Sequence, residues 1–212
     1  MESKTLSLRS LALIAGVSYL IIFFAAIFAN FMALESLTQS PLETIQNHDM
    51  LVRFGVIAFL ITVVFDVVVA WALKEFYKSH YLTLPSTYFR MMHAAIMGVA
   101  IFALPLALKA NTENDIFHYV DLFNTIWLIG LFFFGIHLIL LSKIADTPKF
   151  IRVFLAIAGI MYILDTVAHF TLSNYSEYAS VFLALVAIPS IFGEMAFTVW
   201  LLVKGGKMRK SV

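Results

Sequence analysis

The sequence has no cysteine among its 212 residues. Disulfide bonds, thiolate catalysis and cysteine-ligated metal sites are therefore excluded. Charged residues are also scarce, because they make up 13% of the chain, against about a quarter in soluble domains. The formal net charge is only +1, so the composition gives no general attraction to nucleic acid, and we expect no nucleic-acid partner.

Motifs of familiar enzymes are missing as well. The chain has no His-Glu-x-x-His metal motif, no glycine-rich phosphate loop and no Gly-x-Ser-x-Gly nucleophile elbow. The sequence therefore names no cofactor, and it favours a protein without catalytic activity over an enzyme.

Long apolar runs are what the chain has in abundance, with 62% apolar residues in all. Several runs reach or approach the ~20 residues that cross a ~30 Å hydrocarbon layer. We expect an all-α integral membrane bundle, forming a single transmembrane domain over residues 1–212 and surrounded by the lipid bilayer. The six expected spans are residues 10–34, 51–76, 86–110, 119–143, 149–172 and 179–204.

The basic residues indicate an orientation, because positive charge near a span resists translocation. With these spans, Arg53 and Lys109 fall on one side of the membrane, and the other Lys and Arg residues fall on the opposite side. The residues on that opposite side are Lys4, Arg9, Lys74, Lys78, Arg90, Lys143, Lys149, Arg152, Lys204, Lys207, Arg209 and Lys210. The sequence predicts that this side is cytoplasmic, and that both termini lie on it.

Ionisable residues inside the spans are the candidates for chemistry, because each costs ~2.5–3.5 kcal/mol at the centre of a membrane helix. Asp66 and Glu194 fall roughly 15 Å from the cytoplasmic ends of their helices, and His93 and His137 roughly 10 Å from theirs. Arg90 precedes His93 by one turn on the same face. These five residues form the expected ligand or proton site, in a polar pocket that opens toward the cytoplasm.

A second polar group lies nearer the outer side of the fifth span. Tyr162, Asp165 and His169 share one face there, and Asp165 and His169 are four residues apart. A local pair that stabilises the helix is the alternative to a functional role for this outer cluster. Hydrogen bonding between helices is the corresponding alternative for His93 and for His137.

The second and fifth spans share a spacing of charged residues. Arg53 and Asp66 are thirteen residues apart, as are Arg152 and Asp165. This match raises the hypothesis that the chain consists of two three-helix repeats, the second inverted relative to the first, as in many secondary carriers. Chance is the alternative, because the match rests on two charges and the other span pairs align poorly.

Three stretches carry a resemblance to a known family. They are the segment from Arg53-Phe54-Gly55 to Phe65-Asp66-Val67, the segment from Gly135 to Ser142 that contains His137, and the end of the chain from Ile191-Phe192-Gly193-Glu194 to Gly205. The chain resembles the bacterial multispan membrane proteins catalogued as domain of unknown function 4386. The resemblance covers nearly the whole chain and implies a bacterial inner-membrane protein. It implies no activity.

Three functional interpretations remain open at this point. The first is binding or transport of a small or lipophilic molecule in the polar intramembrane pocket, with protonation coupled to movement. The second is a membrane-embedded, metal-dependent enzyme, in which His93 and His137 with Asp66 or Glu194 would hold the metal. The third is a noncatalytic membrane scaffold, whose polar groups only join the helices.

Overall fold

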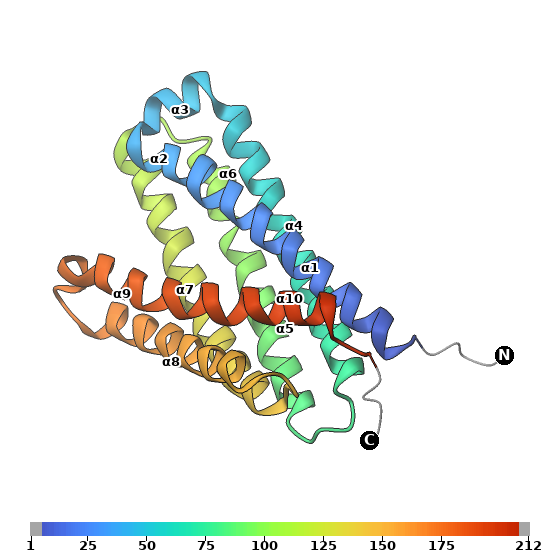
Figure 1. The fold of residues 1–212 in the computed structure, drawn as a ribbon. Coiled ribbons are helices and arrows are strands. Elements are labelled where there is room, and N and C mark those ends of the chain that lie inside the picture. Colours follow the sequence, from blue (N-terminus) through green and yellow to red (C-terminus); the bar gives the residue numbers. More distant parts are fainter. Residues whose placement is uncertain (1–5, 208–212) are drawn as a thin grey trace, which may run out of the picture.

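The computed structural model describes residues 6–207, and its regular elements are all helices (Figure 1). Lys4, Arg209 and Lys210 of the expected basic side lie outside the described residues. The elements are α1 (Leu8–Phe28), the π-helical turn η1 (Ala29–Leu34), α2 (Glu35–Gln39), α3 (Pro41–Asn47), α4 (Asp49–Phe76), α5 (Thr83–Ala100), α6 (Ala103–Ala107), α7 (Glu113–Ile144), α8 (Lys149–Thr171), α9 (Tyr175–Ser190), the π-helical turn η2 (Ile191–Met195) and α10 (Ala196–Val203).

The expected six spans are confirmed. Six helices are long and apolar enough to cross a membrane: Leu8–Gln39, Asp49–Phe76, Thr83–Ala107, Glu113–Ile144, Lys149–Thr171 and Tyr175–Val203. The largest shift of a boundary is in the fourth span, which begins at Glu113 and not at residue 119. Many large apolar side chains point outward from these helices, such as Phe24, Phe102 and Phe170. This is a multi-pass membrane protein with lipid-facing helices.

Polar residues and prolines set several of the helix ends. The Ser7 hydroxyl accepts a hydrogen bond from the Ser10 amide at the start of α1 (3.0 Å), and Thr112 accepts one from the Asp115 amide at the start of α7 (3.2 Å). Such N-caps satisfy amides that have no partner within the helix. Pro148 is the residue that directly precedes α8, and its backbone is not helical (φ −49°, ψ 142°).

Two π-helical turns interrupt the first and the last span. In the last span, Pro189 has no amide hydrogen to donate, and η2 begins two residues later. In the first span, the Asn30 side chain donates to the carbonyl of Ala26 (2.9 Å) where η1 begins. Removal of a backbone donor and insertion of a polar side chain both disturb the regular helical ladder.

The interior consists of two apolar layers. The first layer joins α1, α4, α7, α8 and α10 through Ala12, Ala15, Tyr19, Val69, Ala72, Leu73, Phe134, Leu138, Leu141, Ala145, Ile151, Leu155, Ala158, Phe197 and Leu201. The second layer joins the first four spans through Ala29, Leu37, Val52, Ala58, Phe59, Ala100, Ile101, Ala103, Leu104, Ala107, Ile116, Val120 and Phe123. The last two spans therefore contribute to only one of the two layers, and buried polar side chains lie between the layers.

The first and last spans are joined at the end of the bundle near both termini, which we call the basic end. Arg9 donates to the carbonyl oxygens of Leu201 (3.1 Å), Gly205 (2.9 Å) and Leu202 (2.5 Å). A cation is favourable there, because the last carbonyls of a helix lack partners and carry partial negative charge. Gly206 has a φ of 68°, and a Cβ atom at this position would lie 2.5 Å from the Arg9 amide nitrogen.

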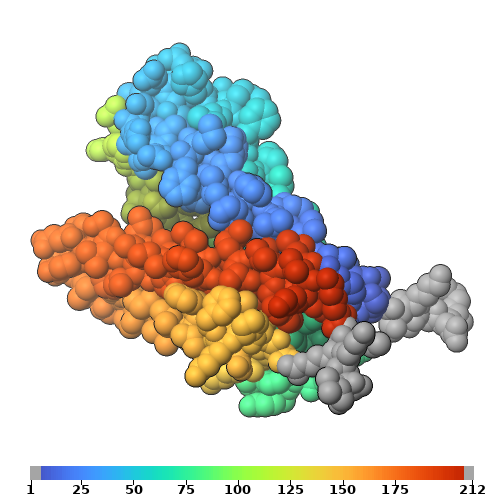
Figure 2. Space-filling model, viewed as in Figure 1, coloured from blue at the N-terminus to red at the C-terminus, as the bar shows by residue number. Residues whose placement is uncertain are grey.

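The first and last spans diverge away from the basic end. There α9 and the second half of the first span leave a hollow between them, with part of α7 at its floor (Figure 2). The exposed side chains of Phe31 and Ile191 lie beside it. The bundle is thus closed at the basic end and open on this side toward the lipid-facing surface.

Helices α7 and α8 approach each other through a pair of glycines. A Cβ atom on Gly135 would lie 2.5 Å from the Gly159 carbonyl oxygen, and a Cβ atom on Gly159 would lie 2.5 Å from the Gly135 oxygen. Any side chain at either position would push the two backbones apart. The crossing of α7 and α8, which positions His137 and Tyr162, depends on this contact.

Replacing Gly135 by alanine should therefore destabilise the bundle. We expect a loss of ~1–3 kcal/mol in the free energy of unfolding, because the added methyl group has no space. The matched control is Gly98→Ala, where the nearest atom to an added Cβ is Val63 Cγ1 at 4.0 Å. Thermal unfolding of the purified variants in detergent measures the difference, and equal stability of the two variants would contradict the glycine contact.

Candidate functional site

A buried ion pair joins α4 and α5 between the two apolar layers. Arg90 Nη2 lies 2.5 Å from Asp66 Oδ1, and the side chains are only 1% and 8% exposed. An unpaired charge at this depth would cost several kcal/mol, so each of these groups requires the other. The structure therefore pairs Arg90 with Asp66 and not with Glu194, the other acid of the expected site.

Tyr19 brings α1 into the same network. Arg90 Nη1 donates to the Tyr19 hydroxyl (2.6 Å), and the centre of the guanidinium lies 4.7 Å from the Tyr19 ring centroid and 5.3 Å from that of Phe134. Both distances are within cation–π range. Tyr19 was not predicted, because the inner site was inferred from acids, histidines and arginine alone.

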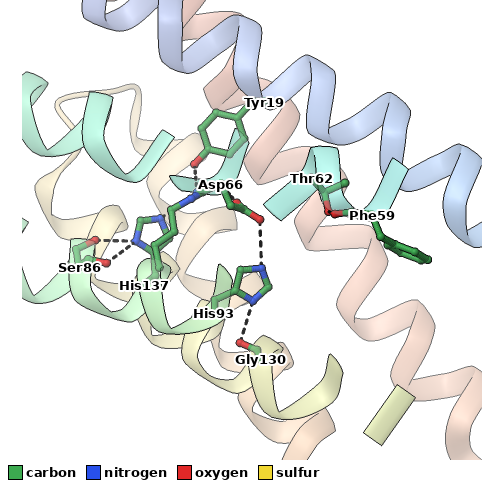
Figure 3. A network of polar contacts seen from close by, with 9 residues as sticks. Tyr19, Phe59, Thr62, Asp66, Ser86, His93, Gly130 and His137 are labelled. Carbon is green, nitrogen blue, oxygen red and sulfur yellow. Dashed lines mark hydrogen bonds and ion pairs between the residues drawn. The ribbon is translucent and has the colours of Figure 1, made fainter. Parts of the chain in front are cut away.

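His137 supports Arg90 from α7 (Figure 3). Its Nδ1 lies 3.0 Å from the Ser86 carbonyl oxygen and 2.9 Å from the Ser86 hydroxyl, and its Nε2 lies 3.3 Å from Arg90 Nη1. A carbonyl only accepts and a guanidinium only donates. The geometry therefore assigns the proton to Nδ1, leaving Nε2 as a neutral acceptor for Arg90.

His93 contacts Asp66 from the other side. Its Nδ1 lies 3.0 Å from the Gly130 carbonyl oxygen, and its Nε2 lies 3.5 Å from Asp66 Oδ2 (Figure 3). The Gly130 carbonyl accepts a hydrogen bond from Nδ1, and the Asp66 carboxylate is the charged group nearest to Nε2. Asp66 thus lies between Arg90 and His93.

A cavity of about 600 Å³ adjoins this network. Its inner wall contains Tyr19, Asp66, Arg90 and His93, and Glu194 lies in the wall formed by the last span. Four of the five expected site residues therefore line one cavity. The fifth, His137, lies behind Arg90 and lines a separate space of about 10 Å³.

A second cavity of about 590 Å³ continues from the first toward the lipid-facing side. The two share residues of α1, α7, α8, α9 and η2, namely Tyr19, Ile22, Ala26, Asn124, Tyr162, Leu183 and Glu194. Their walls are mainly apolar, with a few polar groups at the inner end. This combination is typical of sites for small molecules.

The cavity does not open where the sequence led us to expect. It reaches from Arg90 to Tyr175 and Ala179, in the first turns of α9. These residues lie away from the basic end, where the first apolar layer is packed without a space of this size. The expected opening toward the basic residues is wrong, because α9 separates from the first span only in the half of the bundle away from the basic end.

The outer cluster of Tyr162, Asp165 and His169 does not form the expected local pair. Asp165 accepts a hydrogen bond from the Tyr175 hydroxyl (2.7 Å), and His169 packs edge-on against the Tyr175 ring at 4.7 Å between centroids. Tyr162 and Asp165 both line the cavity. Tyr175, which the sequence analysis missed, therefore connects the cluster to α9.

The metal site of the second interpretation lacks a suitable group of ligands. Within residues 6–207, no three His, Asp or Glu side chains are placed to share a metal ion. Arg90 contacts both Asp66 and His137, so its positive charge lies among the ligands that the metal hypothesis requires. Cations repel one another, and this arrangement disfavours a bound metal there.

The repeat hypothesis remains a prediction. Asp66 and Asp165, the residues it equates, line the same cavity from α4 and α8. Their partners differ, because Asp66 pairs with Arg90 and Asp165 with Tyr175.

The two ion-paired aspartates of α4 provide a test of the buried network. Asp66→Asn removes the charge that balances Arg90, so we expect a loss of ~3–5 kcal/mol in the free energy of unfolding. Asp49→Asn is the matched control, because Asp49 pairs with Arg53 at 2.8 Å but both side chains are exposed, and its loss should be much smaller. Thermal unfolding in detergent measures both, and similar losses would contradict the role of the buried pair.

Comparison with known proteins gives a family and no activity. A protein of Archaeoglobus fulgidus, described as an uncharacterized protein, is 28% identical over 165 residues, which cover 75% of this chain and 88% of the relative. No solved structure is significantly similar to the chain. The family model described as Domain of unknown function (DUF4386) matches residues 14–205. Because this match covers most of the chain and all six spans in whole or in large part, the protein belongs to the DUF4386 family, as its sequence landmarks implied.

Proposed function

We propose that the protein binds, and exchanges with the bilayer, a small lipophilic molecule held in the cavity between the first span, α7 and α9. We also propose that it does so in the inner (cytoplasmic) membrane of a bacterium, with both termini in the cytoplasm. The observation that carries the proposal is the cavity of about 600 Å³, whose apolar walls end at the network around Arg90.

The size and lining of the cavity favour ligand binding over a purely structural role. Protein interiors are close-packed, so a scaffold has no need for a large space beside its most costly charges. Sites for small molecules typically have volumes of ~300–1,000 Å³ and few polar groups. The cavity matches both properties.

The route of entry favours a lipophilic ligand. The second cavity extends between Ile27 and Phe31 of the first span and Ile191 of the last span, and these side chains are 39%, 69% and 55% exposed. The exposed surface of these spans faces lipid tails. A molecule dissolved in the bilayer therefore reaches the inner polar network without passing through water.

Trp127 lines the cavity and provides a direct reporter of occupancy. With Trp71 and Trp200 replaced by phenylalanine, it is the remaining member of the three tryptophans. A neutral brominated fatty alcohol should quench its fluorescence saturably in detergent. Ala187→Phe should weaken this quenching by about tenfold or more, because the ring fills part of the cavity.

Ala184→Phe is the matched control for Ala187→Phe. Ala184 is on the same helix, but it lines a separate groove of about 540 Å³ against α8, which shares no lining residue with the two cavities. Quenching in this variant should equal that of the parent protein. Quenching that is not saturable, or that both phenylalanines affect equally, would count against a ligand in the cavity.

The absence of cysteine allows a test of the proposed orientation with single introduced cysteines. Ser79 is exposed in the turn between α4 and α5, and Ser173 is exposed in the turn between α8 and α9. In intact bacterial spheroplasts, a membrane-impermeant maleimide should label Ser173→Cys and not Ser79→Cys. Lysis should expose Ser79→Cys to the reagent. Labelling of Ser79→Cys and not of Ser173→Cys in intact spheroplasts would show that the orientation is the opposite of the one proposed.

A further inference from the structure

The walls of the two cavities carry an excess of acidic side chains. Asp66, Asp165 and Glu194 line the first cavity, and Glu35 and Glu194 line the second. Among the described residues, Arg90 is the single Lys or Arg side chain that lines either of them. The sign of charge that the cavity favours in a ligand thus depends on which of these side chains are free to contact it.

Arg90 is not available to a ligand. Its side chain is 1% exposed, and its terminal nitrogens already contact Asp66, Tyr19 and His137. An anionic ligand would have to displace Asp66, and that carboxylate would then be buried without a partner. The cavity therefore lacks a free cation to hold a negative group.

Glu194 is the acid that lines both cavities, whereas Glu35 lines only the second. Glu194 lies within η2 at the junction of the two cavities, and its side chain is only partly buried. No Lys, Arg or His side chain within residues 6–207 forms an ion pair with it. Its near neighbours are the hydroxyl groups of Tyr162 and Ser190. Asp66, in contrast, is paired with the charge of Arg90, and Asp165 lines only the first cavity, where it accepts a hydrogen bond from Tyr175.

Aromatic rings line both cavities. Tyr19 and Tyr162 line both cavities, and Trp127, Phe134 and Tyr175 line the first one. The faces of aromatic rings attract cations, and this attraction is strongest where water is excluded. They also provide apolar surface for the body of a ligand.

From this distribution we infer that the ligand is a lipophilic organic cation, such as an amine or a quaternary onium ion. Its positive group lies against Glu194 and the aromatic rings, and its apolar part extends along the lateral cavity toward the bilayer. This inference rests on the proposed function, because it names the chemical class of the molecule that occupies the same cavity. The partly buried carboxylate provides the charge complement, and the apolar walls provide most of the contact area.

Two ions of the same shape and opposite charge test this inference. Tetraphenylphosphonium and tetraphenylborate are titrated against the protein that contains only Trp127, in a neutral detergent. The Ala187→Phe variant is titrated in parallel, and the part of the quenching that this variant lacks reports binding in the cavity. We expect the phosphonium to bind at least about tenfold more tightly than the borate.

Variants of Glu194 test whether this residue causes the preference for the cation over the anion. Glu194→Gln should weaken phosphonium binding by about tenfold or more, and it should not weaken borate binding. Glu113→Gln is the matched control, because Glu113 is exposed at the start of α7 and does not line either cavity. Its affinities should equal those of the parent. The comparison of the two ions on the parent protein needs no variant of Glu194, so it decides the question even if Glu194→Gln does not fold.

The outcomes separate this inference from the proposed function. Equal affinities for the two ions, tighter binding of the borate, or an unchanged phosphonium affinity in Glu194→Gln would overturn the inference. In these cases, binding of the neutral alcohol that Ala187→Phe weakens would still support the proposed function. If neither ion nor the alcohol binds in a manner that depends on position 187, both proposals are wrong.

Discussion

The charge on Arg90 is the constraint that the rest of the structure accommodates. A guanidinium does not lose its proton under ordinary conditions, so it must be neutralised and hydrogen-bonded wherever it is buried. Here its partners come from three other helices, with Tyr19 on α1, Asp66 on α4 and His137 on α7. One side chain of α5 thereby fixes the rotation of four helices about their axes.

The cavity follows from the way in which the apolar layers are distributed. Near the basic end, α8 and α10 complete a layer that packs without a large space. In the other half the first four spans pack among themselves, α8 still contacts α7 through Thr166 and Leu128, and α9 stands away from them. The polar network lies at the boundary between the two layers. The charged side chains that cost most free energy to bury, Asp66 and Arg90, are therefore the ones that line the cavity.

The number and extent of the spans could be predicted from the sequence, because membrane thickness fixes the length of an apolar run. The buried acids, histidines and Arg90 could also be identified, since their cost inside a membrane requires partners. The choice of partner could not be predicted. It depends on helix rotation and on close contacts such as that between Gly135 and Gly159, two glycines on different helices that form no motif within either one. The opening of the cavity could not be predicted either, because it follows from the separation of α9 from the first span, and amino-acid composition does not indicate such a separation.

The contact of Arg9 with the end of the last span has a consequence for synthesis. Its carbonyl partners follow it by 192 to 196 residues, so the first helix enters the membrane long before the residues that complete its end contact exist. Until α10 is inserted, the side of α1 that will face the last span is covered by lipid or by the insertion machinery. The lateral wall around Glu194 is then also missing. Assembly of the cavity is thus the final event in the biogenesis of the bundle, and a chain that stops before its last span has the charged network but lacks one wall of the cavity.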